Sequence, residues 1–425
     1  VAQAAQLAGT HDVTLSAGHD ISLGTGADTH VEAHSSSVKK SGVFGGGGAS
    51  GLGGIGFTVG SASGKASSTV EQHTTTGSLV GSTEGNVTVV AGGDVAITGS
   101  DLIAGRAAGA TSGGNIAVQG QNITIAPAAQ TDHETNQQKQ SQHGVTVAMV
   151  NTPLDGFRNI QQNSHSGNGN QVKRWDSVAQ AVGNTGLDAP GVAIGYGSHS
   201  ASHAGTYDSV TQQGSSLRAA GDLSLTATGA HNSGGDLSVI GSALSAGGTA
   251  TLDAQRDLNL LASTDSLASG DTNHSHHRSI VAAPVGLGDM FRQIQGGSNS
   301  SGVSMSPYNL LGSNGQSAQT ATTQTATTID ADRIDLVSRQ GDITAQGAQL
   351  NAQHDITALA QQGGITLGNG ENSQAWQSRQ SSHQFGDLGG SGYSGTTGER
   401  SEQHQTTGSQ TQQSTVRTGI ASAQG

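Results

Sequence analysis

A short unit that recurs along this chain constrains its fold more than any other feature. The unit is a turn residue, then Asp or Asn, then aliphatic residues that alternate with small polar ones, as in Gly92-Gly93-Asp94-Val95-Ala96-Ile97. Further copies begin at Gly18, Gly221, Gly234, Arg256, Gly341 and His354. Alternation in a strand turns the aliphatic side chains to one face. Gly tolerates positive φ and an Asx side chain can bond the backbone two residues on, so each unit predicts a turn followed by a strand.

The spacing of the units predicts the architecture. Equivalent residues lie 22 apart in Ile334 and Ile356 and in Ile343 and Ile365, and 21 apart in Leu237 and Leu258 and in Val95 and Ile116. One coil of a parallel β-helix, with two or three short strands, needs that length, and coils stack about 4.8 Å apart. Parallel strands joined in this way wind right-handed. The prediction is an all-β chain that forms a right-handed parallel β-helix.

Longer polar tracts interrupt the coils. We expect coils at 1–23, 86–128, 215–262 and 327–368, and hairpin or short-helix excursions at 24–85, 129–214, 263–326 and 369–425, the last ending in a polar tail. In the first excursion two apolar stretches flank the run 45–48, which predicts a hairpin. Phe157 and Ile160, repeated as Phe291 and Ile294, suit a short amphipathic turn. Together these blocks form one continuous repeat domain.

Composition excludes several classes of function. The net charge is −13, with 17 Lys and Arg against 30 Asp and Glu, so no nucleic-acid partner is expected. Aromatic residues make up 3% and charged residues 11%, while 67 residues are Gly, which favours a thin core of small aliphatic side chains. The chain has no Cys, which fits an exported protein without disulfides. It starts in mid-pattern, as a slice of a longer protein would.

No catalytic, cofactor-binding or metal-binding residue is predicted, although several residues have the chemistry for such roles. His274, His276 and His277, with Asp271 nearby, carry zinc-ligand chemistry, but His in a polar tract is more simply solvated. A carbohydrate-active β-helix would need clustered carboxylates and aromatic platforms. The candidates for those roles are Asp94, Asp236 and Asp342, which turn formation explains, and Trp175 and Trp376, which lie in excursions. The basic pairs Lys39-Lys40 and Lys173-Arg174 are interpreted as solvated.

Several of these segments together resemble a known family. They are Lys39-Lys40-Ser41-Gly42, the glycine run 45–48, Thr74-Thr75-Thr76-Gly77-Ser78, Gly92-Gly93-Asp94-Val95 and Gly99-Ser100-Asp101-Leu102. The combination looks like the haemagglutinin-repeat region of two-partner-secreted exoproteins, which include filamentous haemagglutinins and the CdiA-type proteins of contact-dependent growth inhibition. The resemblance covers nearly the whole chain.

The resemblance implies a non-enzymatic role at the surface of a Gram-negative bacterium. It implies export through an outer-membrane transporter and a β-helical filament that engages the outer membrane or a receptor of a target cell and supports toxin delivery. The alternative is the shaft of a filamentous haemagglutinin adhesin that binds host cells, and a carbohydrate-active enzyme is a distant third. The alternating Ile55, Phe57 and Val59 motivate one hypothesis, that excursion hairpins release from the coils and enter a membrane.

Overall fold

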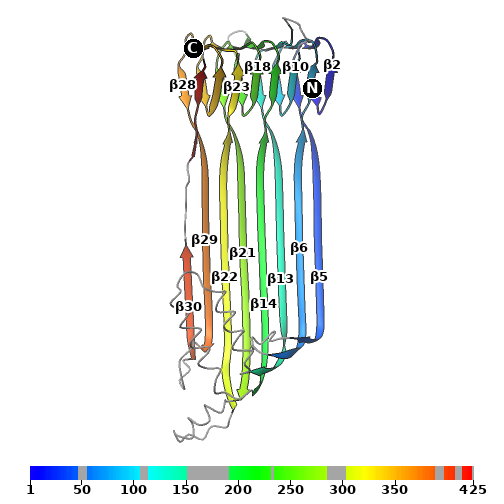
Figure 1. Cartoon of the computed structure of the whole chain (residues 1–425), viewed down its shortest axis with the longest axis vertical. Helices are drawn as coiled ribbons and strands as arrows, with labels where there is room; N and C mark the ends of the chain where they lie inside the picture. The colour runs from blue at the N-terminus through cyan, green and yellow to red at the C-terminus, as the bar shows by residue number, and fades with distance from the viewer. Residues whose placement is uncertain are drawn as a thin grey trace.

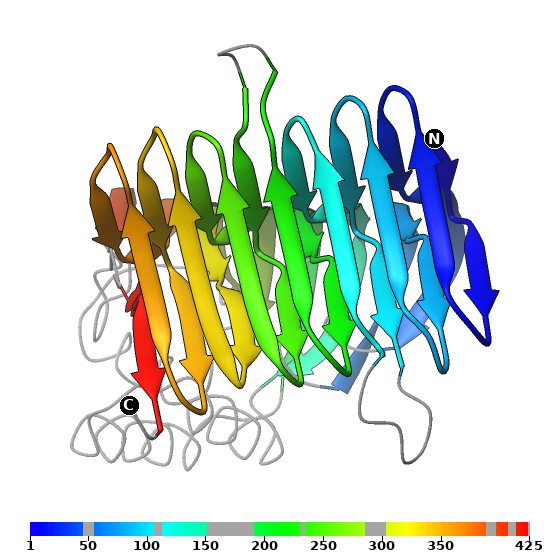
Figure 2. The ribbon, with the colours of Figure 1, turned by 90° about the horizontal axis from the view of Figure 1, so that it is seen from above.

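The computed structural model describes residues 1–45, 55–105, 113–150, 191–230, 234–284, 303–387, 397–406 and 414–423. In this part of the chain every regular element is a β-strand, and three parallel sheets form the sides of a solenoid (Figures 1 and 2). The structure confirms the predicted all-β parallel β-helix. None of the described residues belongs to a helix with the length and apolar character needed to cross a membrane.

Each coil contributes one short strand to each sheet. The first sheet contains β1 (Ala2–Gln3), β4 (Ile21–Gly24), β9 (Val95–Thr98), β12 (Ile123–Ala126), β17 (Leu237–Ile240), β20 (Leu258–Leu261), β25 (Ile343–Gln346) and β28 (Ile365–Gly368). The second contains β2 (Gln6–Gly9), β7 (Leu79–Ser82), β10 (Asp101–Ala104), β15 (Ser216–Ala219), β18 (Ala243–Ala246), β23 (Thr327–Ala331), β26 (Ala348–Ala352) and β32 (Gly419–Ser422). The third contains β3 (Val13–Ala17), β8 (Val87–Ala91), β11 (Ile116–Gly120), β16 (Leu223–Ala227), β19 (Thr249–Ala254), β24 (Arg333–Ser338) and β27 (Ile356–Ala360).

The excursions form a fourth, antiparallel sheet, which we call the hairpin sheet. Its strands are β5 (Gly26–Gly45), β6 (Ile55–Thr76), β13 (Ala128–Val150), β14 (Gly191–Gln213), β21 (Ser263–Pro284), β22 (Val303–Thr325), β29 (Gly370–Asp387) and β30 (Thr397–Thr406), with β31 (Ser414–Val416) paired to β29. These long strands project away from the solenoid (Figure 1). The hairpin expected around 45–48 is present as β5 and β6, while the turns expected at 157–161 and 291–295 lie outside the described residues.

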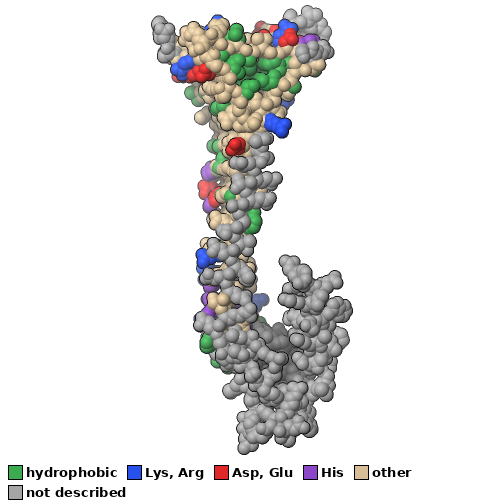
Figure 3. Space-filling view, turned by 90° about the vertical axis from the view of Figure 1, so that its left-hand side faces the viewer, with side chains coloured by type: hydrophobic (Ala, Val, Ile, Leu, Met, Phe, Trp, Pro, Cys, Tyr) green, Lys and Arg blue, Asp and Glu red, His purple; other side chains and the backbone are tan. Residues whose placement is uncertain are grey.

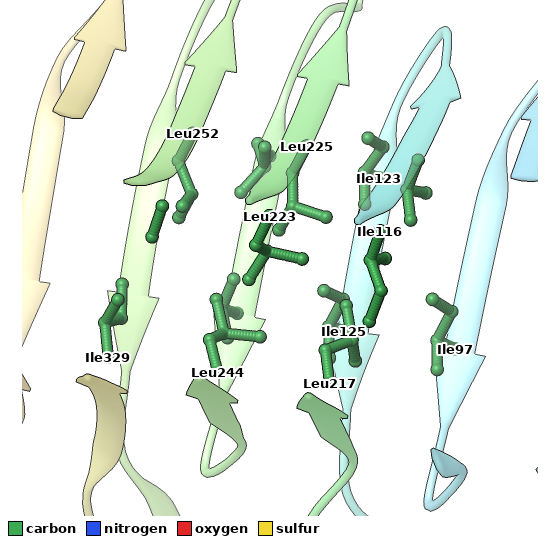
Figure 4. Packing of buried hydrophobic residues seen from close by; sticks show 14 of the residues in the cluster. Ile97, Ile116, Ile123, Ile125, Leu217, Leu223, Leu225, Leu244, Leu252 and Ile329 are labelled. Atoms are coloured by element: carbon green, nitrogen blue, oxygen red, sulfur yellow. The ribbon is translucent and has the colours of Figure 1, made fainter. Parts of the chain in front are cut away.

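The solenoid core is the thin aliphatic stack that the alternation predicted. Leu223 and Leu225 on β16 are fully buried, with Leu252 of the neighbouring coil beside them (Figure 4). Leu225 lies in register with Val118 of one adjacent coil and with Leu252 of the other. The polar residues between them face outward. Each coil therefore gains its stability from the coils next to it, as in other repeat proteins.

The coil period is correct in three of the four predicted pairs. Ile334 pairs with Ile356, Ile343 with Ile365 and Leu237 with Leu258. The step from Val95 to Ile116 is wrong because these residues belong to different sheets, and Val95 pairs with Ile123 instead. This coil is longer because residues 105–115 separate β10 from β11.

Two solenoid strands lie inside ranges expected to be excursions. β7 begins at Leu79, before the expected start at residue 86, and β32 occupies part of the polar tail, where it pairs with β26. Neither strand follows a turn that contains Asp or Asn, which is the sequence feature that predicted the other coils. Both follow the corner at which a hairpin returns to the solenoid.

The Asx residues of the repeat bond across coils, not within their own turns. Asn122 Nδ2 donates to Asp94 Oδ1 at 2.8 Å, and Asn122 Oδ1 accepts from the backbone N–H of Gly235 at 2.8 Å and of Asp236 at 3.1 Å. The same ladder continues from Asp257 to the N–H of Asp342 at 2.9 Å. The expected bond two residues on is therefore replaced by one to the equivalent corner of the next coil. At the corner the backbone leaves the sheet ladder and its N–H needs another acceptor.

We expect Asn122→Ala to lower the free energy of unfolding by about 1–3 kcal/mol, because it removes one acceptor and one donor from the ladder. Denaturant titration followed by circular dichroism measures this change. Asn259→Ala is the matched control, since Asn259 makes only a 3.5 Å contact with Ser238 on the outer surface. Equal effects of the two substitutions would contradict the ladder's contribution.

Candidate functional site

Every hairpin leaves the solenoid at the same corner, between the first and second sheets, and only on alternate coils. β4, β12, β20 and β28 lead into hairpins, whereas β9, β17 and β25 pass directly to the next strand of the second sheet. β1 also passes directly to β2. The direct corners contain Gly99, Gly241 and Gly347 with φ of 53°, 50° and 62°, and Ala4 with φ of 48°. Positive φ favours Gly, which three of these four corners have, so Gly at this position indicates a direct corner.

The alternation explains how the hairpins join into one sheet. Neighbouring strands lie about 4.8 Å apart, so two coils and one two-stranded hairpin have the same width of roughly 9.6 Å. Each hairpin therefore meets the next one in register, as in the pairing of β6 with β13 from His73↔Thr131 to Ile55↔Met149. The solenoid sets the spacing of the hairpins.

Buried hydroxyl groups line the corner from which the hairpins depart. The hydroxyl of each serine accepts a hydrogen bond from the backbone N–H of the serine in the preceding coil. The N–H of Ser78 donates to Ser100 Oγ at 3.1 Å, that of Ser100 donates to Ser215 Oγ at 3.2 Å, and that of Ser215 donates to Ser242 Oγ at 3.2 Å. All four serines are nearly inaccessible to solvent. The stack satisfies backbone groups at the corner, both in coils that carry a hairpin and in coils that do not.

Nearer the solenoid the hairpin sheet is one layer thick in the edge-on view (Figure 3), whereas Thr58, Thr146 and Ser279 near its far end are buried. Where it is one layer thick, the sheet buries few apolar side chains. Hydrogen bonds between polar side chains on neighbouring strands stabilise it instead. Ser63 bonds Ser141 at 2.8 Å, and Ser275 bonds Ser313 at 2.8 Å. In this one-layer part most side chains are therefore exposed on both faces.

An exposed apolar patch lies on one face of the hairpin sheet, at the end away from the solenoid. One row of directly paired residues crosses five strands: Val43, Val59, Val145, Tyr196 and Ile280. Phe57 and Ile194 lie two residues further out on the same face. These seven residues define the apolar patch, and each is between 42% and 70% exposed. Clustered exposure of this kind marks interaction surfaces.

A belt of cationic residues follows the apolar patch on the same face, toward the solenoid. It consists of Lys39, Lys65, Lys139, Arg278, His143, His274 and His276, which strand alternation and register place together. The four cross-strand rows from Ser41–Leu310 to Ser35–Gln316 hold no Asp or Glu on this face. We call these seven residues the basic belt. Histidines along the projecting sheet are visible in Figure 3.

The histidine run 274–277 is divided between the two faces of the sheet. His274 and His276 lie in the basic belt with ring centroids 4.4 Å apart, while His277 and Asp271 point to the opposite face. His277 is directly paired with His199, at a centroid distance of 6.2 Å. Among the described residues no group of three or more His, Cys, Asp or Glu is arranged to hold a metal ion.

The pKa values of two histidines follow their surroundings. Burial lowers the pKa of His276, and the nearby His274 and Arg278 lower it further. Burial and His199 lower the pKa of His277. In contrast, a hydrogen bond to Asp208 raises the pKa of His133, which lies closer to the solenoid.

The carboxylates that have the chemistry for a carbohydrate-active site have structural partners. Asp94 and Asp342 accept backbone N–H groups of the next coil, from Asn122 at 3.1 Å and from Gly364 at 2.7 Å. Asp236 pairs with Arg256, whose hydrogen bond lowers the pKa of that carboxyl. Trp376 is 36% exposed on β29, distant in the chain from these turns, and Trp175, Lys173 and Arg174 lie outside the described residues.

Sequence reasoning missed both the apolar patch and the basic belt. It treated Lys39 and Lys40 as an isolated pair, whereas alternation puts Lys39 in the belt and Lys40 on the other face. The signal was the alternation within the polar tracts, but assigning a face needed the register between strands far apart in sequence. Lys65 and Lys139 are 74 residues apart and directly paired.

Comparison with known proteins adds an independent line of evidence. The family model described as "Hemagglutinin repeat" matches residues 1–122, 194–306 and 308–425. A "Toxin CdiA" of Escherichia coli is 29% identical over 415 residues, covering 89% of this chain and 12% of that protein. A "16S rRNA endonuclease CdiA" of Enterobacter cloacae is 31% identical, covering 63% of this chain and 8% of that protein. A "tRNA nuclease CdiA" of Burkholderia pseudomallei is 30% identical, covering 62% of this chain and 21% of that protein.

The chain thus spans between 8% and 21% of the length of these three relatives. No solved structure matches it.

Proposed function

Since the chain belongs to the hemagglutinin-repeat family, we propose that it is a filament segment of a secreted exoprotein of contact-dependent growth inhibition. In this proposal the solenoid forms the shaft outside a Gram-negative cell, after export through an outer-membrane two-partner transporter. The hairpin sheet engages the outer membrane or a surface receptor of the target cell and supports delivery of a toxin. The segment itself has no enzymatic activity and binds no nucleic acid.

One observation carries the proposal: the projecting sheet exposes an apolar patch and a basic belt on the same face. A passive shaft needs only the solenoid, whose aliphatic side chains are buried in its own core. Long hairpins that project from alternate coils add a surface without adding to that core. The names of the relatives, among them a toxin and nucleases, support a link to growth inhibition.

The register of the sheet refines the membrane hypothesis. β6, which contains Ile55, Phe57 and Val59, is paired along nearly its whole length with both β5 and β13. Release of a hairpin would break both ladders, so we propose that the intact sheet makes the first contact through its exposed face.

We expect fluorescently labelled 1–425 to bind saturably to Gram-negative bacteria and not to host epithelial cells, as measured by flow cytometry. Val59→Thr/Tyr196→Thr, which reduces the apolar patch, should weaken binding about thirtyfold, because each of the two side chains contributes on the order of 1 kcal/mol on burial. Val38→Thr/Leu311→Thr is the matched control, since both residues are exposed on the opposite face.

Two outcomes would contradict the proposal. Binding only to epithelial cells would favour the adhesin shaft. Binding to neither cell type would indicate a passive filament.

A further inference from the structure

Lys65 and Lys139 form a direct cross-strand pair of like charge near the middle of the hairpin sheet. Such pairs destabilise a sheet when no opposite charge lies nearby. None of their neighbours on the same face carries a negative charge; these are Ser37, Ser63, Ser67, Gln137, Ser141 and Ser202.

No ion pair among the described residues neutralises the positive charge of Lys65 or Lys139. The ion pairs among the described residues involve histidines, Arg256, Arg333 and Arg339, but neither of these lysines. The chain as a whole carries a net charge of −13, so an excess of acid is available elsewhere. The missing negative charge at the pair is thus a local property of this face.

A shallow depression of about 280 Å³ lies over the lysine pair. Hydroxyl groups of Ser63, Ser141, Ser200 and Ser202 line it, with His274 at the far side. Serine hydroxyls both donate and accept hydrogen bonds, and lysine ammonium groups bind phosphate as point charges. The lining therefore suits a ligand that combines anionic groups with many hydroxyls.

We propose that this depression binds the phosphate-bearing saccharide of an outer-membrane glycolipid, with Lys65 and Lys139 contacting phosphate and the serines contacting sugar hydroxyls. The inference rests on the proposed function and names the chemistry that the hairpin sheet recognises. The lining favours a saccharide, because serines supply half of its polar residues and Gln140 adds an amide. The apolar patch on the same face favours a lipid-linked source, because acyl chains would be its natural neighbours.

The row that contains the site runs across the strands and so along the solenoid. From Lys65 it passes through Lys139 and Ser202 to His274 and then to Asn314. Polar groups therefore recur about every 4.8 Å along this line. Such a row suits an extended chain of sugars better than a single small anion.

The test uses the full chain, immobilised, with purified lipopolysaccharide as the probe in 0.15 M NaCl. We expect Lys65→Gln/Lys139→Gln to weaken binding at least tenfold, because it removes both positive charges that contact phosphate. Lys40→Gln/Arg218→Gln, with the same change in charge away from the site, should bind like the unmodified chain. Circular dichroism verifies that both variants are folded, and lipopolysaccharide stripped of phosphate should bind as weakly as the lysine variant.

Three results would overturn the inference. These are undiminished binding by Lys65→Gln/Lys139→Gln, equal loss in the control variant, and equal binding of dephosphorylated lipopolysaccharide or of dextran sulfate. Parallel measurement on whole bacteria separates the two proposals. If whole cells still bind the chain although purified lipopolysaccharide does not, the glycolipid site is rejected and the proposed function stands. If neither cells nor lipopolysaccharide bind the chain, the proposed function is rejected as well.

Discussion

Deletion of residues 79–100 is expected to preserve the solenoid and to separate the first hairpin from the rest of the hairpin sheet. The deletion removes β7, β8 and β9, which form one coil without a hairpin, and joins Ser78 to Asp101 at an equivalent corner. The hairpins β5/β6 and β13/β14 would then leave the solenoid one coil apart, about 4.8 Å, although a hairpin needs about 9.6 Å. β6 and β13 cannot keep their ladder at that spacing.

Hydrogen–deuterium exchange measures the separation directly. Amides that bridge β6 and β13 should lose protection by several orders of magnitude, because a lone hairpin is only marginally stable in water. Amides of β16 and β19 in the solenoid should be unaffected. The matched control is deletion of 79–215, which removes two coils with one hairpin and restores the spacing. β6 then meets β21 in place of β13, and the amides of β6 should stay protected. Retained protection in the shorter deletion would show that the hairpins do not take their spacing from the coils.

Leu225→Ala is expected to lower the free energy of unfolding by about 2–5 kcal/mol. Leu225 is inaccessible to solvent between Val118 and Leu252, so the truncated side chain leaves a cavity in the stack. The solenoid core is narrow and has few side chains able to shift into that space. Coils on either side depend on the same interface, so the loss is transmitted to their stability.

Guanidinium titration of the variant gives the change in unfolding free energy. Ser224→Ala on the same strand is the control, because Ser224 faces outward and its substitution should change stability by less than about 0.5 kcal/mol. Similar values for the two variants would mean that the core at β16 contributes little.

The solenoid was predictable from the sequence because residues close together in the chain determine each of its strands and turns. Aliphatic residues at alternate positions, as in Leu223 and Leu225, define the buried face within a single strand. The recurring Asp then gives the length of a coil. The pairing of Val95 failed because an 11-residue connection lengthens one coil, and no period can reveal an insertion of that kind.

The candidate site was not predictable in the same way, because it depends on contacts between distant residues. Lys139 has no unusual neighbours in sequence, and its importance comes from facing Lys65 across a strand pair. The hairpins were foreseen as separate excursions, whereas the match between their width and two coils makes them one sheet. The Asx ladder shows the same limit: the residue type predicted a bond, but only the stacked coils fix its partner.

The hairpin sheet also has a mechanical consequence. Its strands of up to 23 residues extend roughly 75 Å from one corner of the shaft, like a fin along a rod. Bending the rod within the plane of the fin would stretch or compress the hydrogen bonds between strands far from the axis. Bending out of that plane leaves those distances nearly unchanged. A filament built in this way is stiff in one direction and compliant in the other, so it deflects sideways while the fin keeps its edge aligned with the shaft.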